Sequence, residues 1–361
     1  MKPRDFLPAI TIDREHGGAA ASGTIDFSTS INPLGPPSAA IAEYHRAIDS
    51  LQRYPDPFAD DLAGKIAQWI GVDADQVLVG SGSTQLIYLL ARAMKWRQPV
   101  VVTPTFSEIA NALILNARSA DRSTPRAVKL DAERDFHLRA DDLTPALASG
   151  ADAIFIGRPN SPTGSMLSFD DAAAIARECE HANAHCVFDE AFIDFVNDAR
   201  SMIHLIGRTS NVIVLRSLTK IFAIPGLRLG FAVAQPRTIS WLRDMLEPWS
   251  VNAIAARVGA ACLDGASEFV ARSRSFVTGE RDRVTHVLAQ NPHLRVLPSA
   301  ANFLMIAARE TGTDSFGLFM KRQGIVVRDL RSLPGGGPGL YRVGIRNHED
   351  NERLLAAARN Y

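Results

Sequence analysis

The stretch SLTKIFAIPGLRLGF (residues 217–231) places a lysine between a polar run and an apolar segment that a Pro-Gly pair interrupts. The preceding stretch, NVIVLR (211–216), contains the apolar run VIVL, as in a buried strand, so Lys220 is predicted to follow a strand end. In α/β folds, ligands bind in the crevice outside the carboxyl ends of the strands. Lys220 is therefore either a surface lysine in a connecting loop or a Schiff-base lysine, with Ser217 and Arg228 holding an anion beside it.

The middle of the chain alternates short β-rich runs with longer helix-like stretches. Apolar residues recur at three- and four-residue spacing in TQLIYLLARAMKW, SEIANALILNA and FDDAAAIARECEHANA, which predicts helices between the strands. Continuously apolar strands that alternate with helices are typical of an α/β fold with a mostly parallel sheet covered on both faces. The predicted strands are VLVG (77–80), PVVVT (99–103), AVKL (127–130), AIFIG (153–157), HCVFD (185–189), NVIVLR (211–216) and LGFAVA (229–234).

The two ends of the chain have other patterns. The first forty-odd residues are rich in Gly, Ala, Ser and Pro without a clear period, and the last part mixes strand-like runs with helical ones. We therefore predict an N-terminal arm or part of the small domain over 1–44, a large domain over 45–275 and a small α+β domain over 276–361.

The bulk composition restricts the classes of partner. The 361 residues carry 39 Lys plus Arg and 39 Asp plus Glu, so no net field favours nucleic acid or an anionic membrane. The start, MKPRDFLPAI, lacks the apolar core of a signal peptide, and no apolar run reaches the roughly 18 residues of a membrane span. The three cysteines lack metal-type spacing, and such a sparse, odd count suits a reducing compartment. We expect a cytoplasmic enzyme without a metal, nucleic-acid or membrane partner.

Polar residues stand at several of the predicted strand ends. Asp189 closes HCVFD, and a carboxylate there either caps the next helix or has a cationic partner such as a protonated pyridine nitrogen. Asn160, in RPNSPTG, either stabilises a turn or hydrogen-bonds a ring hydroxyl. GSGST (80–84) follows VLVG and opens a helix, where free backbone N–H groups could hold a phosphate. Each feature alone is ambiguous.

Their order along the chain is more specific. A Gly/Ser loop, an aromatic after a strand, PNSPTG, the Asp, and Ser-x-x-Lys with an Arg eight residues on follow one another. This order resembles the fold-type-I pyridoxal-phosphate enzymes of the aspartate-aminotransferase superfamily, along essentially the whole chain. The resemblance implies pyridoxal 5'-phosphate as cofactor and a homodimer with shared sites. The implied contacts are Lys220 bonded to the cofactor, Asp189 on its pyridine nitrogen, Asn160 on its phenolic oxygen, Phe106 stacked on its ring, Ser83, Thr84, Ser217 and Arg228 on its phosphate, and Tyr54 on the phosphate in the neighbouring subunit.

Within that superfamily, the chain resembles the threonine-phosphate decarboxylases of cobalamin biosynthesis, which are near relatives of the histidinol-phosphate aminotransferases. The resemblance lies in EHGG (15–18), DFSTSINPLGPP (26–37), EPWSVNAIA (247–255) and VVRDL (326–330). It implies decarboxylation of O-phospho-L-threonine to (R)-1-aminopropan-2-ol O-phosphate and CO2. The implied substrate contacts are His16, Gly17, Asn32, Asn160, Arg328 and Arg342.

Two of the implied arginines have distinct tasks. Arg342 matches the arginine that binds the α-carboxylate throughout the superfamily, and Arg346 is a competing candidate nearby. Arg328, with His16 and Gly17, is then a candidate for the distal phosphate, because a planar guanidinium suits either anion.

Several positions depart from the family pattern. Phe192 stands where many transaminases of the superfamily have a tyrosine, which favours the decarboxylases. Arg158 precedes the Pro-Asn pair in place of a small or polar residue, and it either binds a substrate anion or forms a salt bridge outside the site. Ser161 and Leu330 also differ from the family pattern, so phosphoserine is a second possible substrate.

Two rival functions stay open at this point. One is a histidinol-phosphate-type aminotransferase, against which Phe192 and the EHGG segment count. The second is a regulatory protein that binds the cofactor without catalysis, which should have lost the Lys, Asp or Arg of the site.

Overall fold

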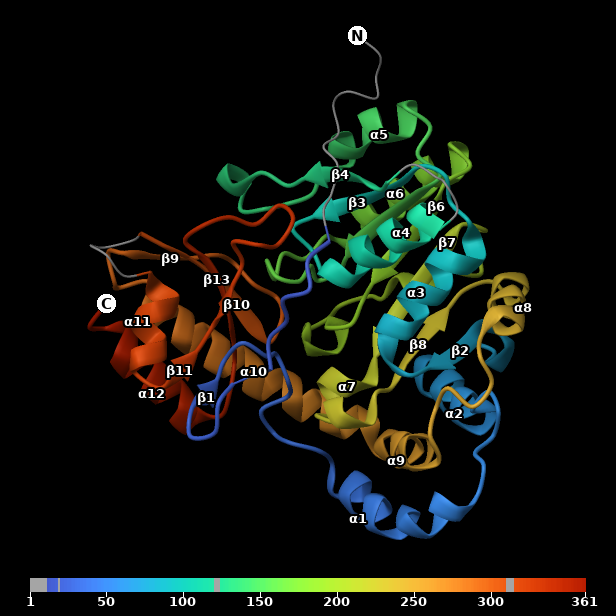
Figure 1. The fold of residues 1–361 in the computed structure, drawn as a ribbon, viewed down its shortest axis with the longest axis horizontal. Coiled ribbons are helices and arrows are strands. Elements are labelled where there is room, and N and C mark those ends of the chain that lie inside the picture. Colours follow the sequence, from blue (N-terminus) through green and yellow to red (C-terminus); the bar gives the residue numbers. More distant parts are fainter. Residues whose placement is uncertain (1–11, 19, 120–123, 310–314) are drawn as a thin grey trace.

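A seven-stranded sheet forms the centre of the larger part of the molecule in the computed structural model, which describes residues 12–18, 20–119, 124–309 and 315–361 (Figure 1). Strand β8 is antiparallel to both of its neighbours, and the other pairs are parallel. The predicted strands are confirmed, with ends that differ by at most one residue. In spatial order the strands are β2 (Val77–Gly80), β8 (Gly230–Val233), β7 (Val212–Ser217), β6 (His185–Asp189), β5 (Ala153–Gly157), β3 (Pro99–Thr103) and β4 (Arg126–Lys129).

Alternate residues of these strands enter two separate cores, because successive side chains of a strand point to opposite faces. Val100 and Val102 of β3 pack in one cluster, whereas Val101 packs in the other. Both faces are thus covered, as the continuously apolar strands predict. The helices of this part, in chain order, are α1 (Ser38–Arg46), α2 (Asp60–Ile70), α3 (Gly82–Met94), α4 (Ser107–Ser119), α5 (Thr144–Ala148), α6 (Phe169–His181), α7 (Leu218–Ile221), α8 (Pro236–Met245) and α9 (Ala253–Leu263).

The smaller part combines residues from both ends of the chain. Its antiparallel sheet contains β12 (Arg328–Asp329), β13 (Leu340–Gly344), β10 (Phe303–Ala308) and β9 (Leu294–Val296), in that order. Helices α10 (Ala266–Leu288), α11 (Phe316–Arg322) and α12 (His348–Ala358) pack with it. Strand β1 (Ile25–Asp26) pairs in parallel with β11 (Ile325–Val326), and Figure 1 shows this blue segment beside the red C-terminal elements.

The domain boundaries predicted from the sequence fall at particular elements. The predicted boundary at 275/276 lies inside helix α10. The predicted arm over 1–44 divides in space, since β1 joins the smaller part while α1 packs on α9. Residues 1–11 of that arm lie outside the described residues. Among the described helices, none has the length and apolar character needed to cross a membrane.

Short 3-10 segments connect several of the elements. They are η2 (Ala47–Gln52), η3 (Ala74–Gln76), η4 (Ala132–Arg134), η5 (Ala140–Leu143), η6 (Ile193–Phe195), η7 (Met202–Leu205) and η8 (Pro225–Leu227).

Candidate active site

A cavity of about 740 Å³ gathers most of the predicted site residues. Its walls come from the carboxyl ends of the large sheet, from the smaller part and from the N-terminal segment before β1. This is where ligands bind in open α/β sheets. The predicted residues that line it are His16, Gly17, Ser83, Thr84, Phe106, Asp189, Ser217, Lys220, Arg228, Arg328 and Arg342.

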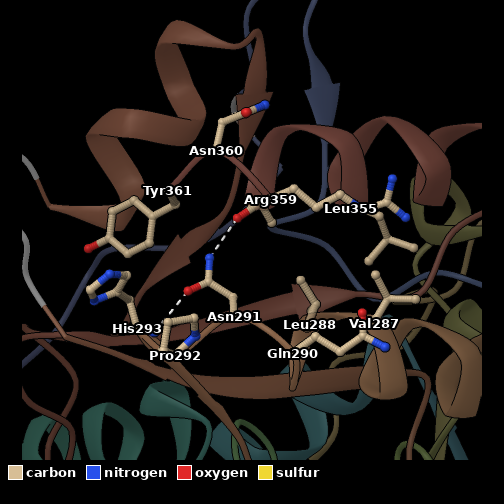
Figure 2. Close-up of a pocket in the computed structure, with 11 residues that line it drawn as sticks. Val287, Leu288, Gln290, Asn291, Pro292, His293, Leu355, Arg359, Asn360 and Tyr361 are labelled. Carbon is tan, nitrogen blue, oxygen red and sulfur yellow. Dashed lines mark hydrogen bonds between the residues drawn. The ribbon is translucent and has the colours of Figure 1, made fainter.

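A second hollow, of about 440 Å³, lies between the end of α10 and α12 (Figure 2). The amide of Asn291 donates to the carbonyl of Ala358 at 2.8 Å, and its oxygen accepts from the backbone N–H of His293 at 2.8 Å. These polar groups therefore hold the C-terminal helix in place. None of the predicted site residues lines this hollow, so the larger cavity is the candidate active site.

The turn between β2 and α3 forms an anion-binding corner of the cavity. Gly82 begins α3 with φ +79°, and a Cβ at this position would lie 2.7 Å from Nη2 of Arg228. The next residues, Ser83 and Thr84, line the cavity at the start of a 13-residue helix. A helix N-terminus with free N–H groups, hydroxyls and an arginine is suited to a phosphate.

Lys220 lies in α7, one short turn after β7. The pKa of its amine is lowered to about 8, first by burial and then by the positive charges of Arg342 and Arg228. Arg342 lowers the pKa of Lys220 more than Arg228 does. At a pKa of about 8, roughly a tenth of this amine is neutral at pH 7, far more than in an ordinary lysine, and the neutral amine is the nucleophile.

Asp189 closes β6 opposite Gly157 of β5. Burial raises the pKa of its carboxyl to about 6, while the N–H of Ala191, which donates to it at 3.0 Å, and the charge of Lys220 act against that rise. Among the described residues, Asp189 forms no ion pair with an arginine. A cation stabilises a buried carboxylate in this state, and a protonated ring nitrogen in the cavity would be such a cation.

Two arginines from adjacent strands face the other side of the cavity. Arg342 on β13 and Arg328 on β12 are register partners. Arg342 donates to Oγ of Ser161 at 3.1 Å and to the carbonyl of Ser28 at 2.7 Å, and its Nε has no partner among the described residues. Burial and the charge of Arg328 lower the pKa of Arg342 to about 10.

Arg328 and Arg346 differ in what they face. Arg328 donates through Nη2 to the carbonyl of Glu15 at 2.6 Å, and its Nη1 lies 3.5 Å from the Glu15 carboxylate. Arg346 is bonded to the Asp350 carboxylate at 2.8 Å and to the carbonyl of Asp26 at 3.0 Å, and it does not line the cavity. This geometry favours Arg342 over Arg346 as the carboxylate-binding candidate.

Three predicted residues lie away from the cavity wall. Asn32 is buried and donates to the carbonyl of Ile221 and to Oγ of Ser273, both at 2.7 Å. Asn160 does not line the cavity: its amide donates to the carbonyl of Pro104 at 2.8 Å, and its oxygen has no hydrogen-bond partner among the described residues. Tyr54 is 88% exposed. Their contacts with a ligand or a second subunit stay predictions.

Glu108 is a cavity residue that the sequence patterns do not single out. It accepts from Tyr88 at 2.6 Å and from Asn111 at 2.9 Å, and it lies 2.9 Å from Nε2 of His16. It thereby fixes the imidazole near the ring of Phe106, whose centroid is 6.2 Å away. Its place in the first turn of α4 is where acidic residues commonly complement the helix dipole, so the sequence offers no distinguishing feature.

The chain belongs to the aminotransferase class I and II family, which matches residues 22–357. Enzymes of this family depend on pyridoxal phosphate, and this protein is accordingly a pyridoxal-phosphate-dependent enzyme. It is 35% identical over 344 residues to the threonine-phosphate decarboxylase of Salmonella typhimurium, a match that covers 95% of this chain and 92% of the relative.

Members of the family with a different activity are also similar. The histidinol-phosphate aminotransferase of Anaeromyxobacter sp. (strain Fw109-5) is 30% identical over 353 residues, covering 97% of this chain and 93% of that relative. The crystal structure of histidinol-phosphate aminotransferase from Sinorhizobium meliloti in complex with pyridoxal-5'-phosphate has the same fold. Its TM-score is 0.80 at 20% identity, over 92% of this chain and 90% of that one.

The cavity fits this cofactor. Gly82 leaves room where a Cβ would strike Arg228, Lys220 offers an amine with a lowered pKa, and Asp189 offers a buried carboxylate without an arginine partner among the described residues. These groups would hold the phosphate, the reactive carbon and the ring nitrogen, respectively.

Proposed function

We propose that this protein decarboxylates O-phospho-L-threonine to (R)-1-aminopropan-2-ol O-phosphate and CO2 for cobalamin biosynthesis. The observation that carries the proposal is that three arginines line one cavity: Arg228 directly after η8, Arg328 on β12 and Arg342 on β13. The reaction brings three anionic groups together: the cofactor phosphate, the substrate phosphate and the substrate carboxylate. Arginine is suited to each of them. The similarity to a threonine-phosphate decarboxylase supports the same activity.

Pyridoxal phosphate, when bound, withdraws electrons from Cα of an amino acid as a bond to that carbon breaks. The protein's part is to hold, orient and transfer protons. Arg228 and the start of α3 bind the cofactor phosphate, and Asp189 keeps a proton on the ring nitrogen. Lys220 presents its amine for attachment of the cofactor.

Orientation of the substrate then selects the bond that breaks. Arg342 binds the α-carboxylate and Arg328 binds the phosphate, so the two ends of the substrate are fixed on neighbouring strands. We propose that these two contacts would orient the substrate so that the Cα–carboxylate bond, and not the Cα–H bond, is the one that breaks. Lys220 Nζ or a water molecule would then supply the proton that replaces the carboxylate on Cα once CO2 has left. Such positioning can lower the activation barrier of the reaction by several kcal/mol, with an upper range of about 7–11 kcal/mol.

A histidinol-phosphate-type aminotransferase is the second candidate, because a relative with that activity is 30% identical. Phe192 counts against it, since its ring lies in the cavity wall, edge-on to Phe303 at 5.0 Å, and provides no phenolic hydroxyl. Phosphoserine is a second possible substrate that differs by one methyl group, a difference of only about 0.8 kcal/mol in burial.

One experiment separates these activities. The pure protein, with pyridoxal phosphate and without a keto acid, is incubated with O-phospho-L-threonine or O-phospho-L-serine while CO2 and the amine product are measured. We expect multiple turnovers of CO2 release, faster with phosphothreonine. Conversion of the cofactor to pyridoxamine phosphate without CO2 would refute decarboxylation and support the aminotransferase.

We also propose that the protein is a cytoplasmic homodimer. Exposed apolar side chains concentrate on α1, η2 and the residues after them, including Ile41, Ile48, Leu51 and Tyr54, with 49%, 59%, 68% and 88% exposure. An apolar surface of this kind fits a second copy of the chain. Light scattering coupled to gel filtration tests this: a single species of twice the 39.2 kDa chain mass is expected, and a monomer would contradict it.

A further inference from the structure

A buried ion pair lies directly behind Asp189. Arg158 follows β5 and Glu190 follows β6, and the preceding residues, Gly157 and Asp189, are register partners. The two charged side chains therefore meet one step beyond the paired strand ends. Nη1 of Arg158 lies 2.9 Å from Oε1 of Glu190, and the side chains are 1% and 0% exposed.

The polar groups of this pair are bonded within the protein. Arg158 donates through Nε to the carbonyl of Leu167 at 2.9 Å and through Nη1 to the carbonyl of Arg200 at 3.0 Å. Glu190 accepts from the backbone N–H of Met202 at 2.9 Å. Neither residue lines the cavity. Of the two possibilities for Arg158, the salt bridge outside the ligand site is therefore the one observed.

Stability alone is a weak explanation for such a pair. Desolvation of two charges offsets most of their attraction, and replacing a buried pair with apolar residues is often neutral or stabilising. The pair is, however, directly connected to the site. The backbone N–H of Arg158 donates to the carbonyl of Asp189 at 2.8 Å, and Glu190 is the neighbour of Asp189 in the chain.

The charges around Asp189 show what the pair can do. The Glu190 carboxylate raises the pKa of Asp189, and Lys220 on α7 lowers it. On the neighbouring strand β7, Arg216 is already paired with Asp194 at 2.5 Å. The guanidinium of Arg158 faces Glu190 directly, at 2.9 Å, so it can offset part of the negative charge that opposes ionisation of Asp189.

We propose that Arg158 and Glu190 are positioning residues for Asp189: the buried pair fixes the backbone that carries Asp189, and the guanidinium of Arg158 offsets part of the field of the Glu190 carboxylate. This inference rests on the proposed role of Asp189 in holding a proton on the cofactor ring. Arg158 and Glu190 themselves do not contact the ligand.

The test is the dissociation constant of pyridoxal phosphate from the full chain, measured as a function of pH. The variants are Arg158→Met, Glu190→Gln and the double variant, with circular dichroism and thermal unfolding to verify the fold. We expect Arg158→Met to move the acid limb of binding upward by about one pH unit, a roughly tenfold weaker affinity on that limb. Glu190→Gln should move it downward, and the double variant should return it close to the wild-type position.

Different results would overturn the inference. Shifts of the same sign in both single variants, or folded variants with an unmoved limb, would mean that the pair is structural only. If Arg158→Met does not fold, Glu190→Gln and the double variant still decide between these outcomes. Asp189→Asn distinguishes a wrong role for Asp189 from a wrong role for the Arg158–Glu190 pair. If it leaves the acid limb in place, the role of Asp189 is wrong; if it removes the limb while the pair variants do not move it, only the pair inference fails.

Discussion

Removal of the Arg328 side chain is the sharpest test of how the substrate is oriented. In the proposed complex its guanidinium binds the substrate phosphate, while Arg342 on the adjacent strand binds the carboxylate. Arg328→Ala should therefore weaken recognition of the phosphorylated end of the substrate and leave the carboxylate contact in place.

The structure sets the size of the expected effect. The Arg328 side chain is only 12% exposed, so solvent screens a phosphate contact weakly. A hydrogen bond to a charged group contributes about 1.5–3 kcal/mol, which corresponds to a loss of about tenfold to 150-fold in kcat/KM. L-Threonine has no phosphate, so its much slower decarboxylation should change little.

The assay compares initial rates of CO2 release from O-phospho-L-threonine and from L-threonine. Two control variants are needed, because Arg328 also bonds to Glu15. Arg346→Ala removes an arginine that is bonded outside the cavity. Glu15→Ala removes one of the two carboxylates near Arg328, the other being Asp13, and keeps the guanidinium. An unchanged kcat/KM in Arg328→Ala, or an equal loss in Glu15→Ala, would refute the phosphate assignment.

Three further predictions concern the cofactor groups. Burial raises the pKa of Asp189 from 3.8 to about 6, so the cofactor-free protein should lose roughly 3 kcal/mol of folding stability at this residue as the pH rises from below 4 to above 6. Asp189→Asn should therefore raise the Tm of the cofactor-free protein at pH 7.5 but not at pH 3.5. Equal effects on Tm at both pH values would contradict this. Gly82→Ala should weaken cofactor binding at least tenfold in equilibrium titrations, because Gly82 has φ +79° and a Cβ there would displace Arg228. An unaltered affinity would show that the phosphate binds elsewhere. Attachment of the cofactor requires the neutral form of the Lys220 amine, whose pKa is about 8. The rate of attachment, followed by absorbance, should therefore level off above about pH 8. A rate that continues to rise up to pH 10 would contradict the lowered pKa.

The large sheet is predictable from the sequence because its strands are buried on both faces and therefore consist of continuous apolar runs. Lys220, Asp189 and Arg228 are predictable as near neighbours, since each follows or flanks a strand end. The sequence does not predict that the amide of Asn32 is used by Ile221 and Ser273, which are 189 and 241 residues away in the chain. Contacts between residues so far apart in the chain depend on how whole elements pack together. The spacing of residues within a local stretch of sequence therefore does not predict them.

The pairing of charged residues is the second feature that the sequence does not predict. Arg158 stands out in the sequence, but its partner Glu190 comes 32 residues later and only the parallel register of β5 and β6 brings the two together. Glu108 does not stand out, because a carboxylate in the first turn of a helix is common. Its partners, Tyr88 and His16, lie on segments that precede it by 20 and 92 residues.

The pairing of β1 with β11 has a consequence for how the enzyme is made. During synthesis, residues 25–26 leave the ribosome some 300 residues before their strand partners, 325–326. Most of the large sheet can form while the chain is still being synthesised, whereas β1 must wait until its partner exists. Arg328 and Arg342 arrive with that late segment. A nascent chain can therefore complete the proposed cofactor corner of the cavity before the two arginines proposed to bind the substrate have been synthesised.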